Sequence, residues 1–144
     1  MPDGAPTATP DRASKRPLVL WAGCALLAAT ALIHLVGYSA ISGESASESG
    51  DAVAFFSLAL RPLWLSVGLH WLFIAAICAL TAKSVSRLSR RIVLACAVII
   101  LLDAALLVAF LGFFGGETLL ALSAVLLAIG ASALTPKLAE RPQT

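Results

Sequence analysis

Three ionisable side chains stand inside long apolar runs of the sequence, where they need partners of a particular kind. They are His34, His70 and Asp103. A charged side chain at the centre of a bilayer costs about 2.5–3.5 kcal/mol even on insertion scales. We therefore expect the three side chains to face the interior of a helix bundle and to find hydrogen-bonding partners there.

The same three residues are predicted to lie at one depth. At a helical rise of about 1.5 Å per residue, His34 lies about 12 Å from the outer end of its helix, and His70 and Asp103 each lie about 15 Å from theirs. Three polar groups from three helices in one layer predict a hydrogen-bonded cluster. In that cluster Asp103 accepts from a histidine N–H and fixes the histidine tautomer.

The chemistry of this layer is left open by the sequence. A polar core that only specifies packing is the simplest use, and a proton path or a solute path is a second. Two histidines and a carboxylate also suit a zinc or iron ion. Finally, His34 and His70 on antiparallel helices could ligate a haem b from opposite sides, with Arg61 near a propionate.

Residues of the second apolar run could support the cluster. Trp71 lies in mid-span, so its indole N–H needs an acceptor or a cavity. It shares a helix face with Trp64, which falls near the outer boundary, where aromatic belts form. Ser66 lies one turn before His70 and could join the cluster, although a serine hydroxyl often bonds a carbonyl of its own helix. Arg61 could instead pair with an acidic residue or reach the headgroups.

The cysteines form a second layer, toward the opposite membrane surface. Cys24, Cys78 and Cys96 each lie near the inner end of an apolar run. An odd number of cysteines without close spacing cannot form a disulfide framework, and a thiolate site would need deprotonation in apolar surroundings. We therefore interpret the cysteines as small buried hydrophobic residues.

The elements that must position these residues are helices that cross a membrane. The chain has 144 residues, of which 60% are hydrophobic and 12% charged, whereas soluble domains average about 25% charged residues. Continuous apolar runs near the roughly 20 residues that cross a bilayer predict helices and exclude strands, which would alternate. The predicted spans are 18–41, 60–82, 92–114 and 118–134. This composition excludes a soluble enzyme, a disordered tail and a nucleic-acid-binding module.

Basic residues predict the orientation of the spans. Nine of the ten Lys and Arg residues fall in the tail 1–16, the link 83–91 or the tail 136–144, and only Arg61 lies on the opposite side. By the positive-inside rule both termini are then cytoplasmic. The first apolar run exceeds the core of about 7–15 residues in a signal peptide, so we expect it to be retained. Residues 17–135 are thus predicted to form one antiparallel four-helix bundle.

The connections between spans carry further expectations. The segment 42–51 is polar and acidic and is predicted to be a solvated external loop. The apolar stretch 52–82 is too long for an upright span, so we expect a short interfacial helix at 52–60, with a strong tilt as the alternative. The short link 115–117 forces the third and fourth spans into a hairpin.

Small residues line faces of the first and fourth spans. They let helix backbones approach closely, either within the chain or against another subunit. They include Gly23 and Ala31 in the first span, and Ala121, Ala124, Ala128, Ala131 and Ser132 in the fourth.

Together these features predict an all-α, polytopic protein of the inner membrane. We expect a non-enzymatic component of a membrane assembly, either a homo-oligomer or a subunit of a larger complex, with the lipid bilayer as its surroundings and no nucleic-acid partner. The alternatives are a proton-path or small-solute transport protein and a metal- or haem-binding redox protein, both acting through the layer of His34, His70 and Asp103.

Overall fold

The computed structural model describes the backbone of residues 11–44 and 51–134, and the side chains of residues 17–38, 62–132 and Leu134. Most of the predicted tails 1–16 and 136–144, and most of the loop 42–51, lie outside these residues. Every described element is helical, which confirms the all-α fold. The elements are α1 (Asp11–Glu44), α2 (Asp51–Thr81), α3 (Arg87–Leu111), α4 (Gly115–Ala131) and a 3-10 turn (Ser132–Leu134).

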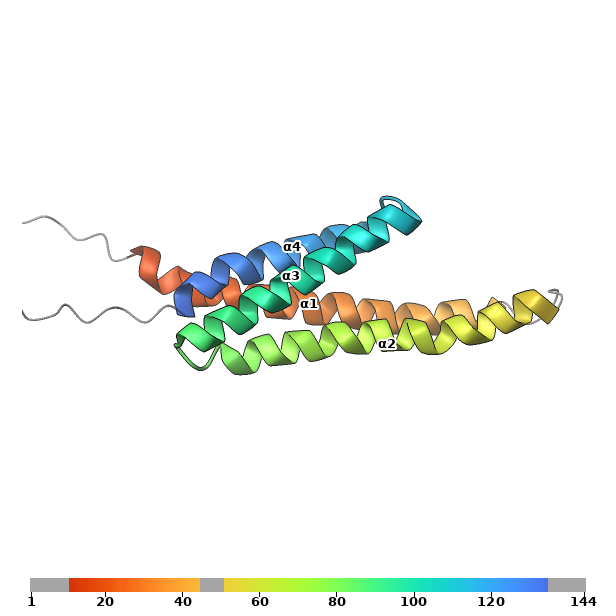
Figure 1. Ribbon diagram of the computed structural model, residues 1–144, viewed down its shortest axis with the longest axis horizontal. Helices are drawn as coiled ribbons and strands as arrows, with labels where there is room; N and C mark the ends of the chain where they lie inside the picture. The colour runs from red at the N-terminus through yellow and green to blue at the C-terminus, as the bar shows by residue number, and fades with distance from the viewer. Residues whose placement is uncertain (1–10, 45–50, 135–144) are drawn as a thin grey trace, which may run out of the picture.

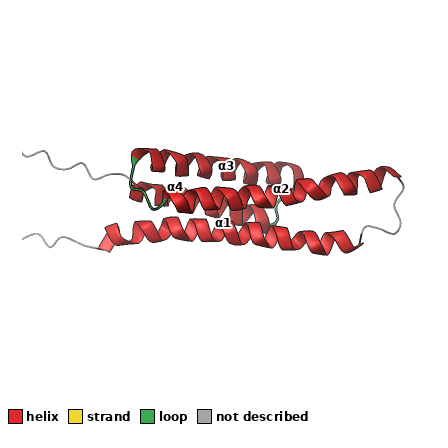
Figure 2. Cartoon of the chain, turned by 90° about the horizontal axis from the view of Figure 1, so that it is seen from below, coloured by secondary structure: helices red, strands yellow, loops and turns green. Residues whose placement is uncertain are grey.

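The helices form an antiparallel bundle whose connections alternate between two ends (Figure 1). The start of α1, the α2–α3 connection and the end of α4 lie at one end, and the α3–α4 connection points toward the other. Helix α1 packs along α2 and α4, and α3 packs along α4, whereas the contact between α2 and α3 is less extensive than these three. Toward the α3–α4 connection, the α3–α4 hairpin diverges from α1 and α2 (Figure 1). Figure 2 shows α3 and α1 on opposite sides of the bundle.

Three of the helices are long and apolar enough to cross a membrane. The segments are Pro17–Tyr38, Pro62–Thr81 and Arg87–Leu111. Helix α4 is apolar and has 17 residues, at the short end of the roughly 17–25 residues that a span needs. A helical chain with several such segments is a multi-pass membrane protein.

The predicted helix at 52–60 is not a separate element. Helix α2 is continuous from Asp51 to Thr81, with Pro62 inside it. Proline removes one backbone hydrogen bond and disfavours the preceding turn, but it does not end this helix. The physical reason is the neighbouring helix: α1 has 34 residues against 31 in α2, continues to Glu44 and packs along α2.

The link between α3 and α4 falls three residues earlier than the predicted 115–117. Helix α3 ends at Leu111, and Gly112 has a φ of 80°, a conformation that glycine adopts readily. Residues 115–117 form the first turn of α4, because the buried Glu117 carboxylate accepts a hydrogen bond from the backbone N–H of Phe114. That bond satisfies a donor that the start of a helix leaves free.

Helices α1 and α4 cross at two glycines. A methyl group added at Gly130 would lie 2.5 Å from the Cα atom of Leu20, and one at Gly23 would lie 3.0 Å from the backbone nitrogen of Leu127. The predicted close approach therefore occurs within the chain. Its tightest point is Gly130, however, and Ala128 of the predicted small-residue face is exposed.

Candidate functional site

A carboxylate joins α2 to α3 in the middle of their spans. The Oδ2 atom of Asp103 accepts a hydrogen bond of 3.0 Å from the indole Nε1–H of Trp71. The Nε2 atom of His70 lies 3.4 Å from the same oxygen. Asp103 on α3 thus contacts two consecutive residues of α2, His70 and Trp71.

His34 of α1 reaches this group through aromatic rings. Its imidazole stacks on the indole of Trp64 with ring centroids 4.2 Å apart and planes inclined by 8°. It also meets Trp71 edge-on, with centroids 4.9 Å apart and planes at 63°. Trp71 therefore contacts both His34 and Asp103, and connects the three helices. We call these five residues, His34, Trp64, His70, Trp71 and Asp103, the polar network.

His34 and Trp64 also exchange hydrogen bonds with each other's backbone. The Nε2 atom of His34 lies 3.1 Å from the carbonyl oxygen of Trp64, and the Nε1–H of Trp64 donates to the carbonyl oxygen of His34 at 2.9 Å. Because a carbonyl oxygen only accepts, the proton of a neutral His34 resides on Nε2. These two bonds fix the register of α1 against α2.

The structure brings together two of the three ionisable residues of the predicted layer. His70 and Asp103 meet directly, and Trp71 has the acceptor that an indole N–H in mid-span requires. His34 instead pairs with Trp64, which sequence reasoning assigned to the aromatic belt. The signal that could have found this pair is the spacing of seven residues between Trp64 and Trp71, which places both on the helix face that meets α1.

Of the other predicted supporting residues, Ser66 does not join the polar network. The hydroxyl of Ser66 donates to the carbonyl oxygen of Leu63 in its own helix, at 2.9 Å. The side chain of Arg61 lies outside the described residues.

Metal ligation receives no support from the described side chains. Among them, no group of three or more His, Cys, Asp or Glu residues is arranged to hold a metal ion. In addition, Nε2 of His34, an atom that could ligate iron, is already engaged by the Trp64 carbonyl. In this structure the Nε2 atom of His34 and the Oδ2 atom of Asp103 both take part in hydrogen bonds to tryptophan residues.

Contrary to the prediction that His70 faces the bundle interior, the His70–Asp103 pair is open to the outside of the bundle. The side chain of His70 is 48% exposed and that of Asp103 is 27% exposed. Exposed apolar side chains flank the pair along both helices: Leu63 and Ile77 on α2, and Ile99, Leu106 and Phe110 on α3. We call this surface, with His70 and Asp103, the α2–α3 seam. Hydrocarbon cannot hydrogen-bond, so an imidazole and a carboxylate exposed at this depth need a polar cover.

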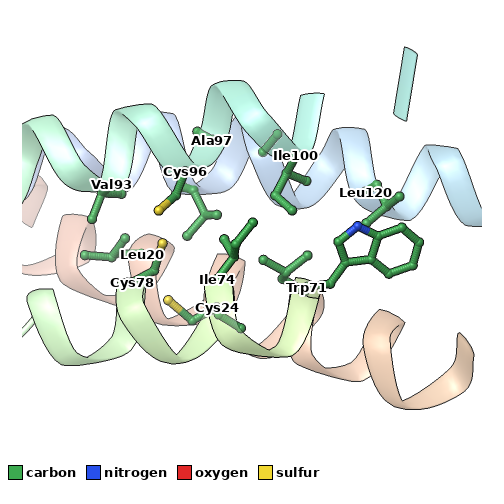
Figure 3. Close-up of a cluster of buried hydrophobic side chains, with 14 of the residues drawn as sticks. Leu20, Cys24, Trp71, Ile74, Cys78, Val93, Cys96, Ala97, Ile100 and Leu120 are labelled. Carbon is green, nitrogen blue, oxygen red and sulfur yellow. The ribbon is translucent and has the colours of Figure 1, made fainter. Parts of the chain in front are cut away.

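The three thiols form a buried layer nearer the α2–α3 connection (Figure 3). Cys24, Cys78 and Cys96 are 5%, 0% and 7% exposed. Figure 3 shows the sulfur atoms converging among apolar side chains such as Leu20 and Val93. The predicted layer is thus a cluster that fills the core where three helices meet.

Because the three thiols are buried, their rate of alkylation tests whether the core is packed as described. In mild detergent we expect a maleimide to alkylate Cys24, Cys78 and Cys96 more than about tenfold slower than in sodium dodecyl sulfate, because alkylation requires local opening. Mass spectrometry of timed, quenched samples measures this. A cysteine introduced at the exposed Ser84 should react rapidly in both detergents. Equal rates for the native cysteines in both detergents would contradict the buried layer.

Comparisons with known proteins give no assignment: no family model matches the chain, and no curated protein or solved structure matches it. The geometry of the polar network and of the α2–α3 seam must therefore carry any functional conclusion.

Proposed function

We propose that this chain is a non-enzymatic component of a larger protein assembly in the cytoplasmic membrane. The observation that carries the proposal is the partly exposed His70–Asp103 pair in mid-span. Lipid tails leave such groups without hydrogen-bonding partners. A protein surface that covers the α2–α3 seam supplies partners, and polar side chains of this kind hold membrane helices together.

The packing within the chain also favours the α2–α3 seam as the surface that a partner covers. Helices α1 and α4 cross at Gly23 and Gly130, and α3 packs along α4, so these contacts are filled from within. The contact between α2 and α3 is less extensive than the α1–α2, α1–α4 and α3–α4 contacts. The polar groups therefore lie where the bundle itself provides the least cover.

The charge distribution supports the location and orientation of the proposed component. Nine of the ten Lys and Arg residues belong to the two tails and the link 83–91. The start of α1, the α2–α3 connection and the end of α4 share one end of the bundle (Figure 1). By the positive-inside rule this end is cytoplasmic.

A proton path is the second candidate function, and one observation favours it. The imidazole Nε2 atom of His70 and the carboxylate Oδ2 atom of Asp103 lie 3.4 Å apart, and both side chains are accessible from outside the bundle. Acid–histidine pairs inside membranes serve proton relays. A proton relay would require the imidazole of His70 to carry the proton. An assembly would require only that a partner covers the α2–α3 seam.

Native gel electrophoresis of tagged protein from its own membranes tests the proposal. We expect the wild-type chain to migrate in a complex, and His70→Leu to shift it toward the monomer because the seam loses a polar contact. Ser66→Ala is the matched control, since that exposed hydroxyl bonds only its own helix.

The two candidates predict different results. A monomer in native membranes contradicts the assembly. Proton flux into vesicles reconstituted with the purified wild-type chain, abolished by His70→Leu, would replace the assembly with the relay.

A further inference from the structure

We propose that the surface covering the α2–α3 seam is the same seam of a second copy of this chain. In the resulting symmetric dimer His70 of each copy faces Asp103 of the other. This inference rests on the proposed function and names the partner. It is carried by the donor and acceptor chemistry of the exposed pair and by the spacing of the apolar residues beside it.

The exposed pair has unused hydrogen-bonding capacity. His70 Nε2 lies 3.4 Å from Asp103 Oδ2, longer than the roughly 2.7–2.9 Å of a strong charge-assisted hydrogen bond. Among the described residues, the Nδ1 atom of His70 and the Oδ1 atom of Asp103 have no hydrogen-bond partner. In the imidazolium form of His70 both ring nitrogens are donors, so the Nδ1–H donor then stands beside the Oδ1 acceptor of Asp103 in an apolar wall.

A donor and an acceptor placed side by side are complementary to themselves. In a two-fold interface the same patch meets itself, so a group on one copy contacts a different group on the other. Rotation by 180° about an axis that lies in front of the seam and runs along the membrane normal places each imidazole opposite the partner's carboxylate. A second copy thus satisfies both groups at once, whereas an unrelated apolar helix would satisfy neither.

The apolar flanks have the spacing of a helix-packing surface. Leu63, His70 and Ile77 recur every seven residues along α2, as Ile99 and Leu106 do along α3. Positions seven apart stay on one face over two turns and form the contact line of left-handed helix pairs. The flanking side chains are all exposed in the single chain. They are therefore free to pack against a second copy, with the residues of α2 facing those of the partner's α3.

Cross-linking of the full chain in phosphatidylcholine vesicles measures this contact. Ile99→Cys places a reactive thiol on the seam, and Val125→Cys places one on the exposed face of α4 as the matched control. The native cysteines are buried. With a short bis-maleimide we expect Ile99→Cys to give a dimer and Val125→Cys to remain monomeric.

Removing either polar group should weaken the dimer. In the Ile99→Cys chain, we expect His70→Leu or Asp103→Asn to lower the dimer association constant about tenfold, because each dimer loses two interhelical polar contacts.

A mixing experiment separates pairing between copies from a role inside one copy. Neither variant alone retains a His70–Asp103 contact between chains. A mixed dimer of a His70→Leu chain and an Asp103→Asn chain retains one, between the intact imidazole and the intact carboxylate. We expect cross-linking to recover when the two variants are combined at the same total concentration.

The outcomes distinguish this inference from the function on which it rests. Dimers that cross-link at Ile99→Cys and recover in the mixture support the symmetric contact. Monomers in vesicles together with a complex in native membranes overturn the dimer and leave the proposed assembly, with another protein as its partner. Monomers in both settings overturn both proposals.

Discussion

Replacing Gly130 with alanine is expected to separate α1 from α4 and to destabilise the bundle strongly. The added methyl group would lie 2.5 Å from the Cα atom and 2.7 Å from the backbone nitrogen of Leu20. Overpacking typically costs about 1–3 kcal/mol. We expect a value at the upper end, since backbone atoms cannot rotate away. Unfolding of the purified variant by increasing mole fractions of sodium dodecyl sulfate, followed by circular dichroism, measures this loss.

Gly37 provides the matched control for this experiment. It lies in the same membrane helix as Leu20, and nothing lies within 4 Å of a methyl group added there. Alanine favours a helix over glycine by about 0.8–1.0 kcal/mol, so Gly37→Ala should be neutral or stabilising. If Gly130→Ala and Gly37→Ala unfold alike, the close crossing of α1 and α4 is wrong.

Replacing Trp71 with alanine is expected to have the second large effect. The side chain is 3% exposed, contacts the ring of His34 and donates to Asp103. Removing a buried tryptophan costs about 3–5 kcal/mol in soluble proteins. We expect the lower end here, because lipid solvates apolar groups and only the packing and the hydrogen bond are lost. The same detergent unfolding measures it.

Trp71→Phe isolates the hydrogen bond from the packing. Phenylalanine keeps an aromatic ring beside His34 but has no N–H, so we expect a loss of about 1–2 kcal/mol, within the range of interhelical hydrogen bonds in membranes. In a chain that already carries Asp103→Leu, Trp71→Phe should cost measurably less, because the acceptor is gone. An equal loss in both backgrounds would mean that the indole N–H does not bond the carboxylate.

Trp71 also shows which features of the site can be predicted from the sequence and which cannot. A mid-span indole N–H requires an acceptor because hydrocarbon offers none, so the need is readable from residue type and depth. The identity of the acceptor, Asp103, depends on the rotation of α2 against α3, which is set by packing. The same holds for His34: its ionisable character is evident, but stacking on Trp64 depends on the register of two helices.

The boundaries of the elements were less predictable than their number. Hydropathy continues through Phe113 and Phe114, so it cannot locate the end of α3. The stop signal is Gly112, whose positive φ ends the helix in the way glycine commonly does. Glu117 reads as a surface charge in the sequence, yet its burial and its bond to Phe114 start α4. Likewise, α2 passes through Pro62 because a long neighbouring helix supports it.

The extensive packing of α1 against α4 has a consequence for biosynthesis. Of the four helices, α1 is translated first and α4 last, so the apolar face that contains Leu20 and Leu27 stays uncovered until α4 enters the bilayer. Insertion and folding are thereby separated in time, as they are for proteins whose contacts join distant parts of the chain. A chain that stops after α3 therefore leaves this face of α1 without the helix that covers it.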